Sequence, residues 1–143
     1  MNPRYAKTYN NLGLSFAMLG KMNSAIDYFK KAIEVDSGFA EAHHNLGNAL
    51  NVIGKFKEAV ICLESAIKIN PKFANAYKSL GNVYKKMKHR DKSLEFFDKA
   101  IHLEPNLDYL LGDFVNAKMH LCNWNDIDSL ITIIKKKAAS NEK

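Results

Sequence analysis

The stretch AEAHHNLGNALNVIGKFKEAVICLESAIKINPKF, residues 40–73, contains two amphipathic segments separated by a short break. In the first segment, Leu46 and Gly47 fall on the apolar side of a helix with 3.6 residues per turn. Apolar residues recur at helical spacing in the second segment, which ends at Asn70 because a residue before a proline, here Pro71, avoids the α conformation. The stretch is therefore predicted to form a helical hairpin, with small residues where the helices approach closely.

This hairpin recurs along the chain at a fixed step of 34 residues. The recurring positions are Leu12-Gly13, Leu46-Gly47 and Leu80-Gly81, then Ala32, Ala66 and Ala100. Self-similarity at this period is the signature of tetratricopeptide repeats, and these columns resemble that family. Two departures are mild: Ser37 stands where the other repeats have proline, and Ser93 replaces an alanine. The resemblance implies an all-α fold, a right-handed superhelical solenoid of antiparallel helix pairs.

The period divides the chain into consecutive units. Full repeats are predicted at 6–39, 40–73 and 74–107, and a degenerate capping repeat at 108–139. No linker separates them, so residues 1–143 are expected to form a single array. Pro3 occupies the place of a proline that would close an earlier repeat. Either the chain belongs to a longer array, or the array starts at this phase.

Composition excludes several classes of protein. A hydrophobic content of 47% with clear periodicity excludes a disordered chain. No apolar run approaches the roughly 20 residues of a membrane span, and the N-terminus does not resemble a signal peptide. The two cysteines, Cys62 and Cys122, are isolated from each other, which favours a reducing, cytoplasmic compartment. The net charge of +6 is modest and is compatible with an acidic partner.

The resemblance to tetratricopeptide repeats implies that the first helix of each repeat lines a concave groove. Asparagine is over-represented on these helices, although it is unfavourable inside a helix. Because a carboxamide both donates and accepts, a row of them can hold the backbone of an extended peptide. The predicted peptide-binding residues are Asn11, His44, Asn45, Asn48, Lys78, Asn82 and Asn116. We expect the Asn45 and Asn48 side chains to face water in the free protein.

These asparagines occupy two columns of the repeat. Asn11 and Asn45 share the first column, which Ser79 and Asp113 then interrupt. Asn48, Asn82 and Asn116 form the second column, one helical turn further on. The alternative interpretation, a merely solvated polar face, stays open at this point.

The C-terminal segment carries a second, narrower resemblance. Its Cys-x-Trp-x-Asp core, Cys122, Trp124 and Asp126, is similar to the end of the repeat array in the O-linked N-acetylglucosamine transferase and SPINDLY family. In that family a glycosyltransferase domain comes after the array, and an asparagine ladder holds polypeptide substrates. Nothing in these 143 residues corresponds to the sugar-nucleotide-binding domain.

Other chemistry finds little support in the sequence. Glu41 and His44 lie one turn apart, but no further ligand occurs at a metal-site interval. No nucleophile–base pair is recognisable, and no cofactor motif occurs. A carboxylate clamp for chaperone C-termini is rejected because only Asn45 matches its pattern. The basic cluster at 85–92 indicates either a solvated loop or an acidic partner, and it lacks the interleaved aromatic residues typical of nucleic-acid binding.

The sequence leads to two predicted functions. The first is a non-catalytic module that binds a protein or an extended peptide in the groove. The second is the substrate-recognition region of a glycosyltransferase similar to O-linked N-acetylglucosamine transferase, whose catalytic domain is absent from this chain. Both use the same groove, and they differ in whether a glycosyltransferase domain is encoded after Lys143.

Overall fold

The computed structural model describes residues 2–104, 132, 135–136 and 139. Within 2–104 the regular structure consists of six α-helices: α1 (Pro3–Met18), α2 (Met22–Val35), α3 (Ala40–Val52), α4 (Phe56–Ile69), α5 (Ala74–Lys86) and α6 (Arg90–Leu103). The predicted capping repeat at 108–139 lies outside the described residues, apart from a few isolated positions. The prediction of an all-α array of antiparallel helix pairs is confirmed.

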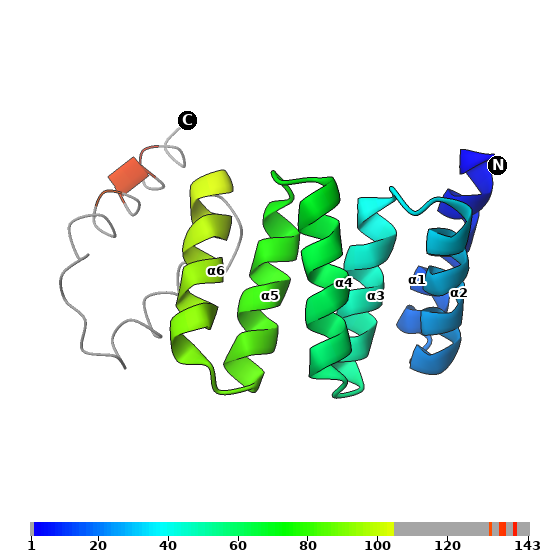
Figure 1. Cartoon of the computed structure of the whole chain (residues 1–143), viewed down its shortest axis with the longest axis horizontal. Helices are drawn as coiled ribbons and strands as arrows, with labels where there is room; N and C mark the ends of the chain where they lie inside the picture. The colour runs from blue at the N-terminus through cyan, green and yellow to red at the C-terminus, as the bar shows by residue number, and fades with distance from the viewer. Residues whose placement is uncertain (1, 105–131, 133–134, 137–138, 140–143) are drawn as a thin grey trace.

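The three helix pairs follow one another along the molecule in the order of the chain. Figure 1 shows the turns inside each pair at one edge and the linkers between pairs at the opposite edge. Each pair, α1 with α2, α3 with α4 and α5 with α6, is packed more extensively than neighbouring pairs are with each other. The molecule is therefore a stack of hairpins, in which each hairpin buries its apolar faces against its neighbours.

The recurring glycines mark the places where the two helices of a pair approach most closely. A Cβ atom added to Gly47 would lie 2.7 Å from Leu63 Cγ, and one added to Gly81 would lie 2.5 Å from the Phe97 ring. Both opposing side chains are completely buried, so they have no free space into which they could move. The glycine column thus permits the close packing predicted from the sequence.

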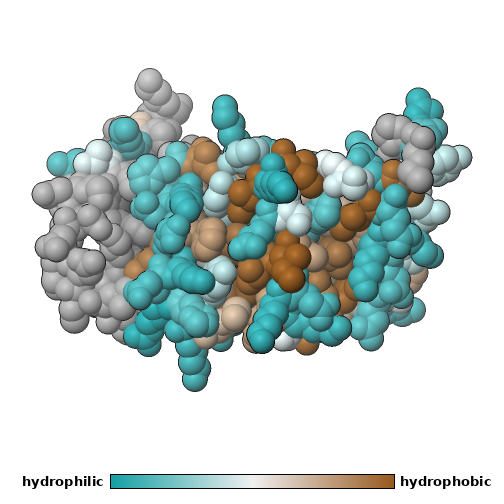
Figure 2. Space-filling view, viewed as in Figure 1, coloured by the Kyte–Doolittle hydropathy of each residue, from teal (hydrophilic) through white to brown (hydrophobic). Residues whose placement is uncertain are grey.

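The second repeat differs from its neighbours in the size of its side chains. In the first repeat the rings of Phe16 and Tyr28 stack at 5.1 Å, and in the third the rings of Tyr84 and Phe96 stack at 5.4 Å. The same column in the second repeat holds the small Cys62. A hollow of about 310 Å³ lies beside it, between α2, α3 and α4. Figure 2 also shows apolar surface in the middle of the array, between hydrophilic side chains.

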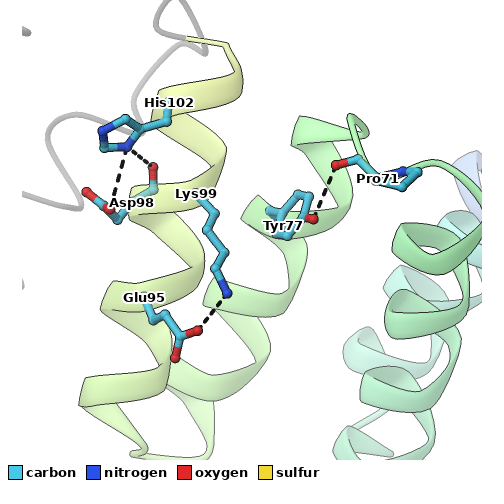
Figure 3. Close-up of polar contacts among 6 residues, drawn as sticks. All are labelled: Pro71, Tyr77, Glu95, Asp98, Lys99 and His102. Carbon is cyan, nitrogen blue, oxygen red and sulfur yellow. Dashed lines mark hydrogen bonds and ion pairs between the residues drawn. The ribbon is translucent and has the colours of Figure 1, made fainter.

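The two departures from the repeat pattern have physical explanations. Tyr77 donates its hydroxyl to the Pro71 carbonyl at 3.2 Å, as Figure 3 shows. The corresponding His43 Nε2 lies 3.0 Å from the Ser37 carbonyl. The linker contributes its backbone oxygen, which serine supplies as well as proline. The buried Ser93 hydroxyl donates to the Gly81 carbonyl at 2.9 Å, so it leaves no unsatisfied donor.

Short-range pairs support the exposed side of α6. Lys99 Nζ lies 2.6 Å from Glu95 Oε1, and His102 Nδ1 lies 2.8 Å from the Asp98 carbonyl oxygen (Figure 3). The exposed i,i+4 ion pair between Lys99 and Glu95 contributes only about 0.2–0.5 kcal/mol. Among the described residues, no helix is both long enough and apolar enough to cross a membrane.

Candidate functional site

The candidate site is the polar side of α1, α3 and α5, the first helices of the three pairs. We call this surface the asparagine face and define it by Asn10, Asn11, His44, Asn45, Asn48, Ser79 and Asn82. The helices bring the side chains together because α3 lies between α1 and α5 and contacts both. The centre of the face is therefore the polar side of α3.

Asn45 connects the second repeat to the first. Its Nδ2 donates to Asn10 Oδ1 at 3.0 Å, and Asn10 is only 4% exposed. A buried amide oxygen without a partner would cost about 1–3 kcal/mol, so this hydrogen bond has a structural role. Asn45 itself is half-buried. The prediction that its side chain faces water is therefore wrong.

His44 connects the second repeat to the third. Its Nε2 lies 3.1 Å from Ser79 Oγ and 3.1 Å from Asn48 Nδ2. An amide nitrogen can only donate, so Nε2 must be the acceptor and His44 must be neutral here. The imidazole also packs against the Phe73 ring, at 4.9 Å between centroids. Asn48 is half-buried and tied to this network, so it does not simply face water either.

The sequence could have revealed these contacts through a step of 35 residues. Asn10 and Asn45 are 35 residues apart, and so are His44 and Ser79. Residues that are 34 positions apart are equivalent in the repeat. The residues that contact each other between neighbouring first helices are instead 35 positions apart. The step of 34 residues therefore did not predict Asn10 as the partner of Asn45, or Ser79 as the partner of His44.

The remaining predicted residues are less involved in this network. Asn11 is exposed on α1, while Lys78 and Asn82 are half-buried on α5. Asn116 lies outside the described residues. Asn51, also on α3, has a buried Oδ1 with no hydrogen-bond partner in the described part of the chain. A buried water molecule could satisfy this acceptor.

Catalytic and metal chemistry gain no support from the geometry. Among the described residues, no group of three or more His, Cys, Asp or Glu side chains could hold a metal ion. Burial raises the pKa of the Cys62 thiol, and the nearby Glu58 adds to that effect. A raised thiol pKa means less thiolate and lower reactivity. What the asparagine face can supply is neutral donors and acceptors in a fixed arrangement.

Comparison with known families now identifies the architecture. The tetratricopeptide repeat matches residues 6–39 and 74–107, and a TPR repeat matches residues 53–88. This chain is a tetratricopeptide-repeat protein. The first and last matched segments coincide with the first and third repeats predicted from the 34-residue step. No curated protein sequence matches the chain.

Solved structures with the same fold include two of MamA. One MamA crystal structure shares 27% identity and a TM-score of 0.84, covering 99% of this chain and 84% of that one. Another shares 30% identity and a TM-score of 0.77, covering 99% and 75%. The first TPR of Spaghetti (RPAP3), bound to the HSP90 peptide SRMEEVD, shares 20% identity and a TM-score of 0.81, covering 86% and 98%.

The His44 network makes the stability of this tetratricopeptide-repeat protein depend on pH. Burial lowers the pKa of the His44 imidazole, and contacts with the Asn45 side chain and the Asn75 backbone oppose part of that shift. The unfolded chain therefore takes up the proton first as the pH falls below the ordinary value of 6.5. We expect stability to be lost as the pH falls from 6.5 through the lowered folded-state pKa.

The His44→Gln variant tests this expectation, because glutamine cannot be protonated in this range. Urea unfolding of both proteins above and below the ordinary histidine pKa measures the effect. We predict that the wild type loses more stability on acidification than the variant does. An identical pH dependence in both proteins would show that His44 is not held in its neutral form.

Proposed function

We propose that the asparagine face binds an extended peptide segment of a partner protein through the peptide backbone. The observation that carries this proposal is the fixed position of two amides at the centre of the face. Asn45 and Asn48 each use one amide hydrogen for a hydrogen bond within the protein. The second hydrogen and the carbonyl oxygen of each amide can still pair with a peptide N–H or C=O group.

Fixed amides favour binding because their side-chain entropy is already lost before the peptide arrives. Asn11 and Asn82 extend the polar row on either side, on α1 and α5. The structure of the Spaghetti (RPAP3) domain with an HSP90 peptide is consistent with this role for the fold. The proposed role is binding rather than catalysis.

A second candidate function places the same face in a glycosyltransferase. In this version the asparagine face presents polypeptide substrates to a catalytic domain encoded beyond Lys143. It rests on the sequence motif of Cys122, Trp124 and Asp126, all three outside the described residues. The coding sequence downstream of Lys143 distinguishes the two functions: a glycosyltransferase domain there favours the second, and a stop codon favours the first.

The experiment for the first function uses a variant that leaves the internal hydrogen bonds intact. Asn11→Ala with Asn82→Ala removes two outer amides and keeps Asn10, Asn45, Asn48 and His44. Each lost contact costs about 0.5–1.5 kcal/mol, so an extended peptide should bind about tenfold more weakly. Titration with labelled peptides of different sequence, at low and high salt, measures the change. Because the amides are neutral, wild-type affinity should depend little on salt.

The matched control is Asn23→Ala, an exposed asparagine on α2 outside the asparagine face. It should leave affinity unchanged. Wild-type affinity in the Asn11→Ala, Asn82→Ala protein, together with a steep loss of binding in salt, would contradict backbone recognition by amides.

A further inference from the structure

One long edge of the array is formed by the three turns that join the helices within each repeat. These turns lie along the same edge in Figure 1, opposite the linkers between repeats. We call residues 18–22, 52–58 and 85–92 the turn edge. The turn edge lies at the C-terminal ends of α1, α3 and α5, whereas Asn45 and Asn48 lie nearer the middle of α3.

The turn edge holds an excess of positive charge equal to that of the whole protein. Eight of its residues are lysine or arginine and two are acidic, Glu58 and Asp91, which gives +6. The chain as a whole has 21 basic and 15 acidic residues, also +6. The remaining residues are thus neutral overall, and the charge is concentrated on one side of the molecule. Such an asymmetric field attracts and orients an acidic partner.

Large apolar side chains are exposed beside these charges. Met18 is 89% exposed, Leu19 71% and Val52 63%. Met18 and Val52 occupy the same position of the first and second repeats, and Lys86 occupies it in the third. Neutralising the lysines alone would leave this apolar surface in water. A partner that also covers it with apolar side chains gains the free energy of burial.

Between the second and third turns the edge is hollowed. The hollow has a volume of about 360 Å³ and is lined by Gly54, Lys55, Phe56, Lys57, Glu58 and Met87. Phe56 and Met87 are partly buried and pack against the core, whereas the lysines are exposed. Lys55 is partly neutralised by Glu58, at 3.3 Å. The lining therefore combines an apolar surface with positive charge at its margin.

We propose that the turn edge docks an acidic protein segment that carries large apolar side chains. One apolar side chain occupies the hollow between the second and third turns, and others cover Met18 and Val52. The carboxylates of the segment face Lys57 and the cations of the third turn. A concave pocket favours an inserted side chain over a lipid surface, because a bilayer would meet the protruding turns and leave the hollow unfilled. This site is additional to the asparagine face.

The test uses a labelled peptide in which glutamate alternates with leucine and includes one phenylalanine. Lys57→Glu with Lys86→Glu reverses two exposed charges, and we expect it to weaken binding about tenfold or more. Lys68→Glu with Lys72→Glu is the matched control, because it changes the net charge equally at the opposite edge of the array. Screening should limit its effect to about twofold at physiological salt. Fluorescence anisotropy gives both affinities.

Four further comparisons make the result specific. Val52→Ser should weaken the peptide severalfold without changing any charge, as should replacing the peptide's leucines by serine. Lys88→Gly should also weaken binding, because it removes a positive charge. It should not strain the backbone, since Lys88 has a left-handed φ of 63° at the position that Gly20 and Gly54 occupy in the other repeats. Asn11→Ala with Asn82→Ala should leave this peptide's affinity unchanged, which separates the turn edge from the asparagine face.

Equal weakening by the charge pairs at both edges would overturn the proposal, because it would show attraction by net charge alone. So would failure of the peptide to bind. Vesicles containing phosphatidylserine form the last arm of the experiment. Vesicle binding that is lost in the Lys57→Glu, Lys86→Glu protein, without peptide binding, would assign the edge to a membrane surface instead.

Discussion

Replacing Gly47 by leucine should destabilise the protein by at least about 1–3 kcal/mol, the usual cost of overpacking a filled core. Even the first added atom would lie 2.7 Å from Leu63 Cγ and 3.2 Å from the Ala59 carbonyl oxygen. Leu63 is completely buried, and the carbonyl belongs to the backbone of α4, so neither can move without separating the helices. The midpoint of urea unfolding measures the loss.

Gly38→Leu provides the control for this experiment. Gly38 is exposed, and a Cβ atom there would meet only Asp36 Oδ1, at 3.3 Å. Its stability should stay within about 0.5 kcal/mol of the wild type, as expected for a surface substitution. Equal unfolding midpoints for Gly47→Leu and the wild type would contradict the close packing of α3 on α4.

Asn45→Ala should also lower stability, because it leaves the buried Asn10 Oδ1 without its donor. The unsatisfied oxygen costs about 1–3 kcal/mol, and the higher helix propensity of alanine returns at most about 0.7 kcal/mol. Adding Asn10→Ala should restore part of the loss, because it removes the unpaired oxygen, while truncating this buried side chain leaves a cavity. Asn11→Ala, at an exposed position of α1, should cost nothing measurable.

A double-mutant cycle measures this coupling by chemical denaturation of the two single variants and the double variant. A single Asn45→Ala protein as stable as the wild type would mean that the hydrogen bond to Asn10 has no structural role. Additive effects of the two single substitutions would lead to the same conclusion.

The fold was predictable because the residues that pack the two helices of a hairpin recur at one fixed step of 34 residues. The recurring glycines Gly13, Gly47 and Gly81 specify where the two helices of each hairpin touch, and their fixed step specifies that neighbouring hairpins are alike. Contacts within a repeat can therefore be derived from the 3.6-residue helical period alone. Contacts between repeats depend on how one hairpin is rotated against the next, which the period does not state.

That rotation explains the errors at the candidate site. The first helices meet at a step of 35 residues, so Asn10 is the partner of Asn45 and Ser79 is the partner of His44. Alignment of the repeats at a step of 34 residues instead groups Asn45 with Asn11 and treats Ser79 as an interruption.

The turn edge could be predicted only in part from the sequence. Its basic cluster could be read, but the exposure of Met18 and the hollow beside Met87 require the three turns to be placed together.

The most direct test of amide recognition is nuclear magnetic resonance of the asparagine side chains. A neutral extended peptide of alanine and serine is titrated into the labelled protein, and the side-chain NH₂ signals are monitored. We predict saturable shifts for Asn45, Asn48 and Asn82, with no shift for Asn23 on α2. Unchanged signals from the asparagine face, with any peptide-induced shifts confined to the turn edge, would contradict amide recognition.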